Sequence, residues 1–196
     1  MSKTEPLISI VILNYNAGTL LSDCVESVLK TRYKNIEIII VDNASSDQSH
    51  IKCKEKFSQI ILQENKENFG YCEGNNIGIR KASGEFVVIL NPDTKVESDW
   101  LDELLKAYQK NGEGLYQPKI LSFDNRIFES AGNMLHVFGF GYPKCRKSTD
   151  IGQYDQSTEI GYASGACLFT ATETIKKIGL FDPFVFLYHD DLDLCW

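Results

Sequence analysis

The chain has 196 residues, of which 43% are hydrophobic and 24% are charged, a balance typical of a globular protein with one substantial core. Its formal net charge of −7 argues against a nucleic-acid partner, because nucleic-acid phosphates require a basic protein surface. The charge is still compatible with a nucleotide bound through a divalent cation, since the ion supplies positive charge of its own.

The cysteines and the apolar segments indicate the cellular compartment of the protein. None of the six cysteines forms a Cys-x-x-Cys pair, which argues against a zinc site and favours free thiols in a reducing, cytoplasmic compartment. The longest apolar runs have the length of strands, and residues 1–6 lack the apolar centre of a signal peptide. Peripheral docking at the inner face of a membrane stays open, and so does the oligomeric state.

In chain order, the hydrophobic pattern alternates between strand-like and helix-like segments. Nearly unbroken β-branched runs at residues 8–13 and 36–41 are typical of strands buried on both faces, and apolar pairs over residues 20–29 recur at helical spacing. The alternation continues with a helix after Asp47, a strand at 60–63, a helix at 71–82, a strand at 85–90 and a helix at 98–108. This order predicts an α/β fold with a mostly parallel, Rossmann-like sheet flanked by helices.

The pattern loosens after about residue 112. Residues 117–154 are rich in glycine and aromatic residues without a clean period, which favours an irregular or hairpin region. Order returns over residues 162–169, and a short helix from about Thr172 is expected to end at Gly179. Because no linker or repeat interrupts the sequence, we predict a single domain over residues 1–196. The chain stops directly after an acidic motif, so we expect it to be the amino-terminal part of a longer protein.

Polar residues follow three of the predicted strands, at Asn14–Asn16, Asp42 and Asn91–Asp93. In parallel α/β sheets, ligands bind beyond the carboxyl ends of the strands, so we expect these three ends to line one cleft. Asp93 offers a hard oxygen ligand there, and magnesium typically takes only one or two protein carboxylates. The alternative is structural, since Asn-Pro-Asp-Thr is strong turn sequence and Asp93 can cap the next segment.

Asp42 also has two interpretations. It can accept hydrogen bonds from a nucleotide base or ribose, as acidic residues after Rossmann strands do. Alternatively, the residues that follow it, 43–47, merely cap the next helix. Residues 67–78 place three glycines and three asparagines at a helix start, which suits phosphate binding, although plain loop structure explains them as well.

The last candidate site is a cluster of acidic residues near the end of the chain. Asp190, Asp191 and Asp193 crowd three carboxylates into four residues. Like charges at this spacing raise the pKa of at least one carboxyl group, which suits a general base. The alternative is that the three residues complement the dipole at the start of a helix.

Together these motifs resemble the inverting family 2 glycosyltransferases of GT-A fold, in particular a rhamnosyltransferase-like branch. The resemblance runs from about residue 7 to the last residue, in seven blocks that follow the family's order. The blocks are residues 8–16, 41–47, 68–78, 90–94, 164–167, 179–182 and 186–196. The resemblance implies a nucleotide-binding half over about residues 7–112 and an acceptor-binding half over about residues 113–196.

The resemblance also implies a role for each matching residue. The residues expected at the donor nucleotide are Asn14, Tyr15, Asn16, Asp42, Asn68, Gly70, Asn75 and Asn91. Asp93 would bind Mg²⁺ or Mn²⁺ on the diphosphate, Asp191 would be the general base, and Asp190 would help to orient the acceptor. Two positions depart from the family pattern, because Asn91 replaces a carboxylate and His189-Asp190 replaces an aromatic-Glu pair. We therefore expect weaker metal binding and an altered acceptor pocket.

The implied reaction is a single displacement with inversion, from a dTDP- or UDP-linked sugar to a hydroxyl of a saccharide or lipid-linked saccharide acceptor. Bacterial polysaccharide synthesis is the implied setting. One alternative is a non-catalytic sugar-nucleotide-binding subunit. A sugar nucleotidyltransferase is a weaker alternative, because residues 14–18 lack the basic side chain with which such enzymes grip a triphosphate.

Overall fold

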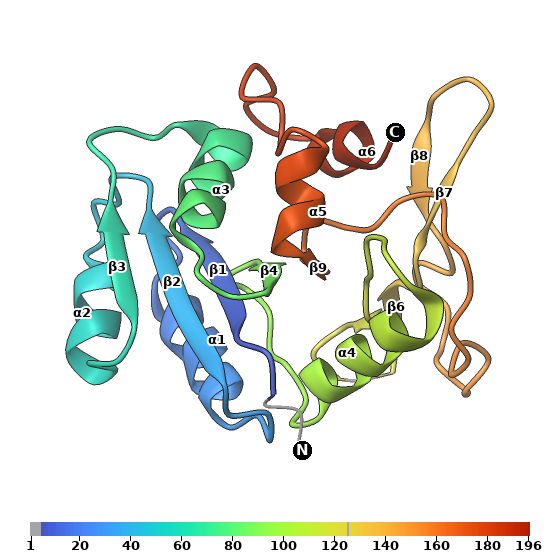
Figure 1. Cartoon of the computed structure of the whole chain (residues 1–196), viewed down its shortest axis with the longest axis horizontal. Helices are drawn as coiled ribbons and strands as arrows, with labels where there is room; N and C mark the ends of the chain where they lie inside the picture. Colours follow the sequence, from blue (N-terminus) through green and yellow to red (C-terminus); the bar gives the residue numbers. More distant parts are fainter. Residues whose placement is uncertain (1–4, 125) are drawn as a thin grey trace.

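A five-stranded sheet in the order β3-β2-β1-β4-β9 forms the centre of the computed structural model, which describes residues 5–124 and 126–196 (Figure 1). Its four parallel strands are β1 (Ile8–Asn14), β2 (Ile36–Asp42), β3 (Ile61–Glu64) and β4 (Phe86–Leu90). The edge strand β9 (Cys167–Ala171) pairs antiparallel with β4. The predicted α/β fold with a mostly parallel sheet is confirmed, and the later half of the chain completes the same sheet.

Helices cover both faces of the sheet because successive side chains of each buried strand point to opposite faces. In β1, Ile10 and Ile12 belong to one apolar cluster, whereas Val11 belongs to the other. The first cluster includes side chains of α1 (Thr19–Leu29), α2 (Ser49–Lys56) and α4 (Trp100–Asn111). The second includes side chains of α3 (Gly70–Lys81) and α5 (Thr172–Lys177).

Glycines let α3 lie close to the sheet. A Cβ atom added to Gly78 would lie 2.3 Å from a methyl carbon of Val11 and 3.0 Å from one of Val41. A Cβ atom on Gly74 would lie 2.5 Å from Leu13. These two glycines therefore serve helix–sheet packing, which favours a structural role for them over the approach of a phosphate to the backbone.

Short hairpins build the region after α4. They comprise β5 (Ile120–Leu121), β6 (Phe128–Ser130), β7 (Asn133–Leu135) and β8 (Gly141–Pro143). The predicted irregular or hairpin region is confirmed, and so is the end of α5 near Gly179, which has a φ of +105°. The last helix, α6 (Asp190–Cys195), ends beside β8 in Figure 1. Among the described residues, no helix combines the length and the apolar character needed to cross a membrane.

Substituting Gly78→Ala tests the packing of α3. Alanine favours a helix over glycine by about 1 kcal/mol, but the new methyl group would collide with Val11 in a close-packed core. We expect a net loss of roughly 1–2 kcal/mol in the free energy of unfolding, measured by urea denaturation. Gly114→Ala is the matched control, because its Cβ would meet nothing nearer than 3.8 Å. Equal stabilities of the two variants would contradict this account.

Candidate active site

The polar ends of three strands meet at one edge of the sheet. β1 lies between β2 and β4, with Asn14 opposite Asp42 and Ile12 opposite Leu90. Because all three strands run parallel, their carboxyl ends and the turn after Leu90 emerge side by side. This is the edge at which α/β proteins bind ligands.

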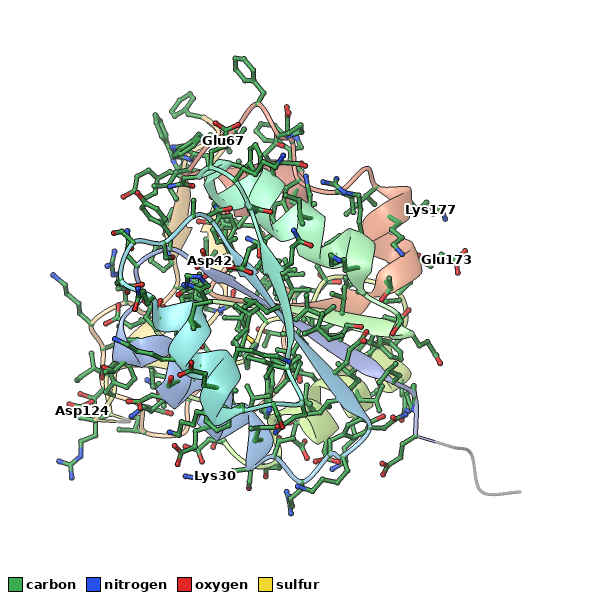
Figure 2. All side chains as sticks on the ribbon, turned by 90° about the vertical axis from the view of Figure 1, so that its left-hand side faces the viewer. Lys30, Asp42, Glu67, Asp124, Glu173 and Lys177 are labelled. Atoms are coloured by element: carbon green, nitrogen blue, oxygen red, sulfur yellow. The ribbon has the colours of Figure 1, made fainter. Side chains whose placement is uncertain are left out.

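Asn14 and Asp42 form the buried base of this edge. The two hydrogens on the Asn14 amide nitrogen Nδ2 are shared among three acceptors, Asp42 Oδ1 at 2.7 Å, Ser49 Oγ at 2.9 Å and Ser45 Oγ at 3.0 Å. The exposed fractions of Asn14 and Asp42 are 0% and 1%. Figure 2 shows Asp42 in the interior, in contrast to Lys30 at the rim. A ligand does not reach either side chain in this conformation, so their expected contacts with a nucleotide stay predictions.

His50 belongs to the same buried cluster, and sequence analysis missed it. Its Nδ1 atom lies 3.2 Å from Asp42 Oδ1 without forming a hydrogen bond to it, and its Nε2 atom lies 3.5 Å from Glu64 Oε1. Asn14 Oδ1 and His50 Nδ1 are both buried without a protein partner in the described structure. The cluster thus retains hydrogen-bonding capacity beneath the edge. In the sequence, His50 is a single histidine in a short helix, and no motif around it indicates that it lies beside Asp42.

Tyr15 and Asn16 follow β1 and are exposed to solvent. The Tyr15 side chain is 53% exposed, so its ring is free to stack on a planar ligand. Asn16 Oδ1 accepts a hydrogen bond from the Ser46 N–H at 2.8 Å, which joins the loops after β1 and β2. Asp47 accepts from the N–H groups of Gly18 and Ser49, so it has the structural role that its sequence position allowed.

The segment before α3 is held by side chains rather than open to a phosphate. Asn43 Nδ2 donates to Asn68 Oδ1 at 3.0 Å and to the Gly70 carbonyl at 2.9 Å. The N–H of Gly70 donates to Asn68 Oδ1, and the N–H of Tyr71 donates to the Phe186 carbonyl. A Cβ atom on Gly70 would lie 2.5 Å from that same carbonyl oxygen. The N–H groups of Gly70 and Tyr71 are therefore occupied by protein groups, which favours the structural alternative for this helix start.

Asn75 lies deeper than expected for a ligand contact. Its side chain is fully buried, and its Nδ2 atom donates to the Tyr71 carbonyl in the preceding turn of α3. Its Oδ1 atom is buried without a protein partner among the described residues. Contact with a nucleotide requires a rearrangement of α3, so this role also stays a prediction.

Asp93 stands in a tight turn directly after β4. The Thr94 hydroxyl donates to the Asn91 carbonyl at 2.7 Å, so Thr94 closes the turn. The Asp93 side chain is exposed, and in the described structure it has no hydrogen bond or ion pair within the protein. Its carboxylate is therefore available to an external cation. This geometry fits a magnesium or manganese ion that takes one protein carboxylate and draws its other ligands from phosphates and water.

The acidic pair lies at the start of α6. The N–H of Gly165 donates to Asp191 Oδ2 at 3.3 Å, and Asp190 Oδ2 lies 3.2 Å from the position that a Cβ on Gly165 would take. Burial, reinforced by the neighbouring Asp191 charge, raises the pKa of Asp190 to about 6. The direction of the shift agrees with the prediction for these acids, but burial contributes more to it than the crowding of like charges. His189 precedes the helix and is exposed.

One short segment contacts both Asn91, two residues before Asp93, and the acidic pair. The N–H of Asn91 donates to the Ala166 carbonyl at 3.0 Å, while the N–H of Gly165 donates to Asp191. The turn that carries Asp93 and the helix that carries the acidic pair therefore flank residues 164–166. Within the part of the chain that the structure describes, no three His, Cys, Asp or Glu side chains cluster as a preformed metal site. A cation here would depend on a bound ligand for most of its coordination.

A parallel sheet with these polar strand ends, an antiparallel edge strand and a second acidic element is the arrangement of GT-A glycosyltransferases. Residues 9–179 match the family model "Glycosyl transferase family 2", and the chain belongs to that family. It is 32% identical over 178 residues to the glycosyltransferase GlyG of Streptococcus pneumoniae, covering 87% of this chain and 57% of GlyG.

Two further proteins are similar along nearly the whole chain. The low-salt glycan biosynthesis hexosyltransferase Agl10 of Haloferax volcanii is 25% identical over 201 residues, covering 96% of this chain and 60% of Agl10. The structure of the mannosyltransferase PcManGT from Pyrobaculum calidifontis, in complex with GDP-Man and Mn²⁺, superposes with a TM-score of 0.70 at 19% identity, covering 98% of this chain and 51% of that one. The chain thus spans little more than half the length of these relatives.

Substituting Asp190→Asn should stabilise the protein at neutral pH. The folded protein keeps a proton on Asp190 up to about pH 6, whereas the unfolded chain releases it near the ordinary value of 3.8. Ionisation of this buried group therefore lowers stability as the pH rises between those values. We expect a gain on the order of 1–2 kcal/mol in the free energy of unfolding at pH 7, which disappears below about pH 4.

Denaturation curves at pH 4 and pH 7 check this expectation. Asp193→Asn removes an exposed carboxylate from the same helix and should change stability by less than about 0.5 kcal/mol. An Asp190→Asn variant less stable than the parent at pH 7 would contradict the raised pKa.

Proposed function

We propose that the protein transfers a hexose from a nucleoside-diphosphate donor, dTDP- or UDP-linked, to a hydroxyl of a saccharide or lipid-linked saccharide acceptor, with inversion. The observation that carries this proposal is the meeting of two acidic elements at residues 164–166. One is the Asp93 turn, joined through Asn91, and the other is the Asp190–Asp191 helix start, joined through Gly165. A diphosphate and an incoming hydroxyl must approach one carbon from opposite sides, and two separate acidic elements suit that geometry.

The donor nucleotide would lie over the ends of β1 and β2. Tyr15 offers an exposed ring for stacking, and Asn16 offers polar groups beside it. Asn14 and Asp42 would support this surface from below through their mutual hydrogen bond. Asn43, which sequence analysis treated only as a helix cap, links the support to Asn68. The nucleotide-binding half would thus correspond to residues 7–112.

Asp93 would hold the metal ion, with Asn91 beside it. A bound Mg²⁺ or Mn²⁺ would neutralise charge on the diphosphate as it departs. The chain supplies one exposed carboxylate at this turn, while Asn91 replaces a second. We therefore place the metal on Asp93 and the donor diphosphate together, with affinity for the metal alone being low.

Asp191 would take the proton from the acceptor hydroxyl. Its Oδ2 atom is held by the Gly165 N–H, and its Oδ1 atom by the Leu192 N–H, so two amides orient the carboxylate. A base that is positioned in this way typically contributes about 10²–10⁴-fold in rate. Asp190, whose pKa of about 6 leaves it mostly ionised at neutral pH, would hold the acceptor hydroxyl beside it.

The relatives support one part of the setting that we propose, the synthesis of a glycan. Agl10 is described as a hexosyltransferase of glycan biosynthesis, and GlyG as a glycosyltransferase. We place the reaction in the synthesis of a bacterial polysaccharide, on the cytoplasmic side and at the inner face of the membrane if the acceptor is lipid-linked.

Asp191→Asn should remove transfer while donor binding stays intact. Asparagine keeps the size of the side chain, but it replaces one of the two accepting oxygens with an amide group and does not take up the proton. We expect the rate of transfer, followed by release of nucleoside diphosphate in the presence of acceptor, to fall by roughly 10²-fold or more. The Kd for nucleotide, measured by calorimetry, should change less than about twofold. Near-normal turnover would contradict the assignment of Asp191 as the base.

In Asp93→Asn, nucleotide affinity should no longer depend on the metal ion. Because Asp93 would be the protein ligand of the cation, manganese should tighten nucleotide binding in the parent but not in the variant, a difference of about tenfold or more. Calorimetric titration of UDP and dTDP with and without Mn²⁺ measures it. Glu97→Gln is the control, since it removes an exposed carboxylate four residues further along. The same loss in both variants would show that only net charge matters.

A further inference from the structure

We infer that Tyr71 is a positioning residue for the acidic pair, because its hydroxyl fixes Gly165, the residue whose N–H holds Asp191. The inference rests on the proposed function, in which Asp191 and Asp190 face the acceptor. Sequence analysis gave Tyr71 no role, and Gly165 was only part of a matching block. The tertiary structure joins the two across the sequence.

Tyr71 is tied at both of its polar ends. Its hydroxyl donates to the Gly165 carbonyl at 2.7 Å, and its backbone N–H donates to the Phe186 carbonyl, also at 2.7 Å. Its ring packs edge-on against Phe181, with the ring centroids 5.9 Å apart. Phe181 and Phe186 belong to the segment that leads into α6. The first turn of α3 therefore contacts both this segment and Gly165, the residue that holds Asp191.

Gly165 has no room for a side chain. A Cβ atom there would lie 2.6 Å from the Tyr71 hydroxyl oxygen and 3.2 Å from Asp190 Oδ2. The Tyr71 hydroxyl, the Gly165 backbone and the acidic pair are therefore in direct contact. Because the Gly165 carbonyl is held by Tyr71 while its N–H holds Asp191, release of the first bond loosens the second.

Tyr71 also connects the acidic pair to the end of β1, where the donor nucleotide is proposed to bind. Asn43 donates through its backbone N–H to the Asn14 carbonyl at 2.8 Å, and through Nδ2 to the Gly70 carbonyl at 2.9 Å. Gly70 immediately precedes Tyr71. Hydrogen bonds thus run from the end of β1, through Asn43 and the start of α3, to the residue that orients Asp191.

The electrostatic surroundings make Tyr71 a donor and not a base. Burial, followed by the charges of Asp190 and Asp191, raises its pKa well above the ordinary value, so the hydroxyl keeps its proton. Titratable groups near the pair include Tyr162, Cys72 and Cys195, and burial raises the pKa of each, so they stay neutral at pH 7. His189 directly precedes Asp190 and is exposed to solvent. The nearby carboxylates Asp182 and Asp193 add only negative charge. Tyr71 therefore acts through its hydrogen bond to Gly165.

Tyr71→Phe tests the inference, because it removes the hydroxyl and keeps the ring against Phe181. We expect kcat for transfer to fall about tenfold, with the donor KM within about twofold of the parent. The pH profile of kcat should also change, because the Gly165 N–H that orients the Asp191 carboxylate becomes looser. Tyr116→Phe is the matched control, because its hydroxyl also donates to a backbone carbonyl, that of Gly112, at 2.7 Å.

A double-mutant cycle with Gly165→Ala makes the test specific. The added methyl group collides with the Tyr71 hydroxyl in the parent, so Gly165→Ala alone should lower kcat more than it does in the Tyr71→Phe background. Additive effects, or a Tyr71→Phe variant whose kcat and pH profile match those of Tyr116→Phe, would overturn the inference.

Titration of the Asp190 and Asp191 side-chain carboxyls by carbon NMR separates this inference from the proposed function, because it needs no turnover. If no donor is turned over by the parent, the proposed function fails. The shift of carboxyl titration in Tyr71→Phe would still show that Tyr71 positions the pair, and unchanged titration would show that it does not.

Discussion

Parallel pairing of β1 on both of its sides is the constraint on which the rest of the structure depends. Its register sets Asn14 opposite Asp42 and Ile12 opposite Leu90, so three polar strand ends reach one edge together. The register is held by burial on two faces, because a slip of one residue would exchange the side chains that contact α1 with those that contact α3. The positions of the candidate binding residues are thus determined by the hydrophobic core beneath them.

Helix α3 transmits this order to the acidic pair. Gly74 and Gly78 bring it close to β1, and Asn76 ties it to the later half of the chain through a reciprocal pair of hydrogen bonds with Phe181, at 2.8 and 3.0 Å. Tyr71 then reaches Gly165. Helix α3, whose glycines and asparagines suit phosphate binding in the sequence, therefore connects the sheet to Gly165 and Phe181. Asp190 lies beside Gly165, the residue that Tyr71 contacts. Burial raises the pKa of Asp190, so keeping its carboxylate ionised at neutral pH costs stability.

Much of the fold and part of the site could be predicted from the sequence. The β-branched runs predict the strands, and strand–helix alternation predicts parallel pairing, because local hydrophobic periodicity reflects which faces are buried. The exposure of Asp93 agrees with its position after β4. The depth of Asn14, Asp42 and Asn75 could not be predicted, since polarity at a strand end or helix start does not reveal whether another side chain, such as Ser49, covers it.

By itself, the sequence determined the type and order of the elements up to α4 and the family resemblance that the family 2 match then confirmed. Both depend on patterns within short segments, and these patterns can be read without knowing which segments are in contact in the folded protein. Only the tertiary structure decided that His50 approaches Asp42, that the Asp93 turn and the Asp191 helix flank residues 164–166, and that Tyr71 contacts Gly165. These contacts join segments far apart in the chain, and close packing of the whole core selects them.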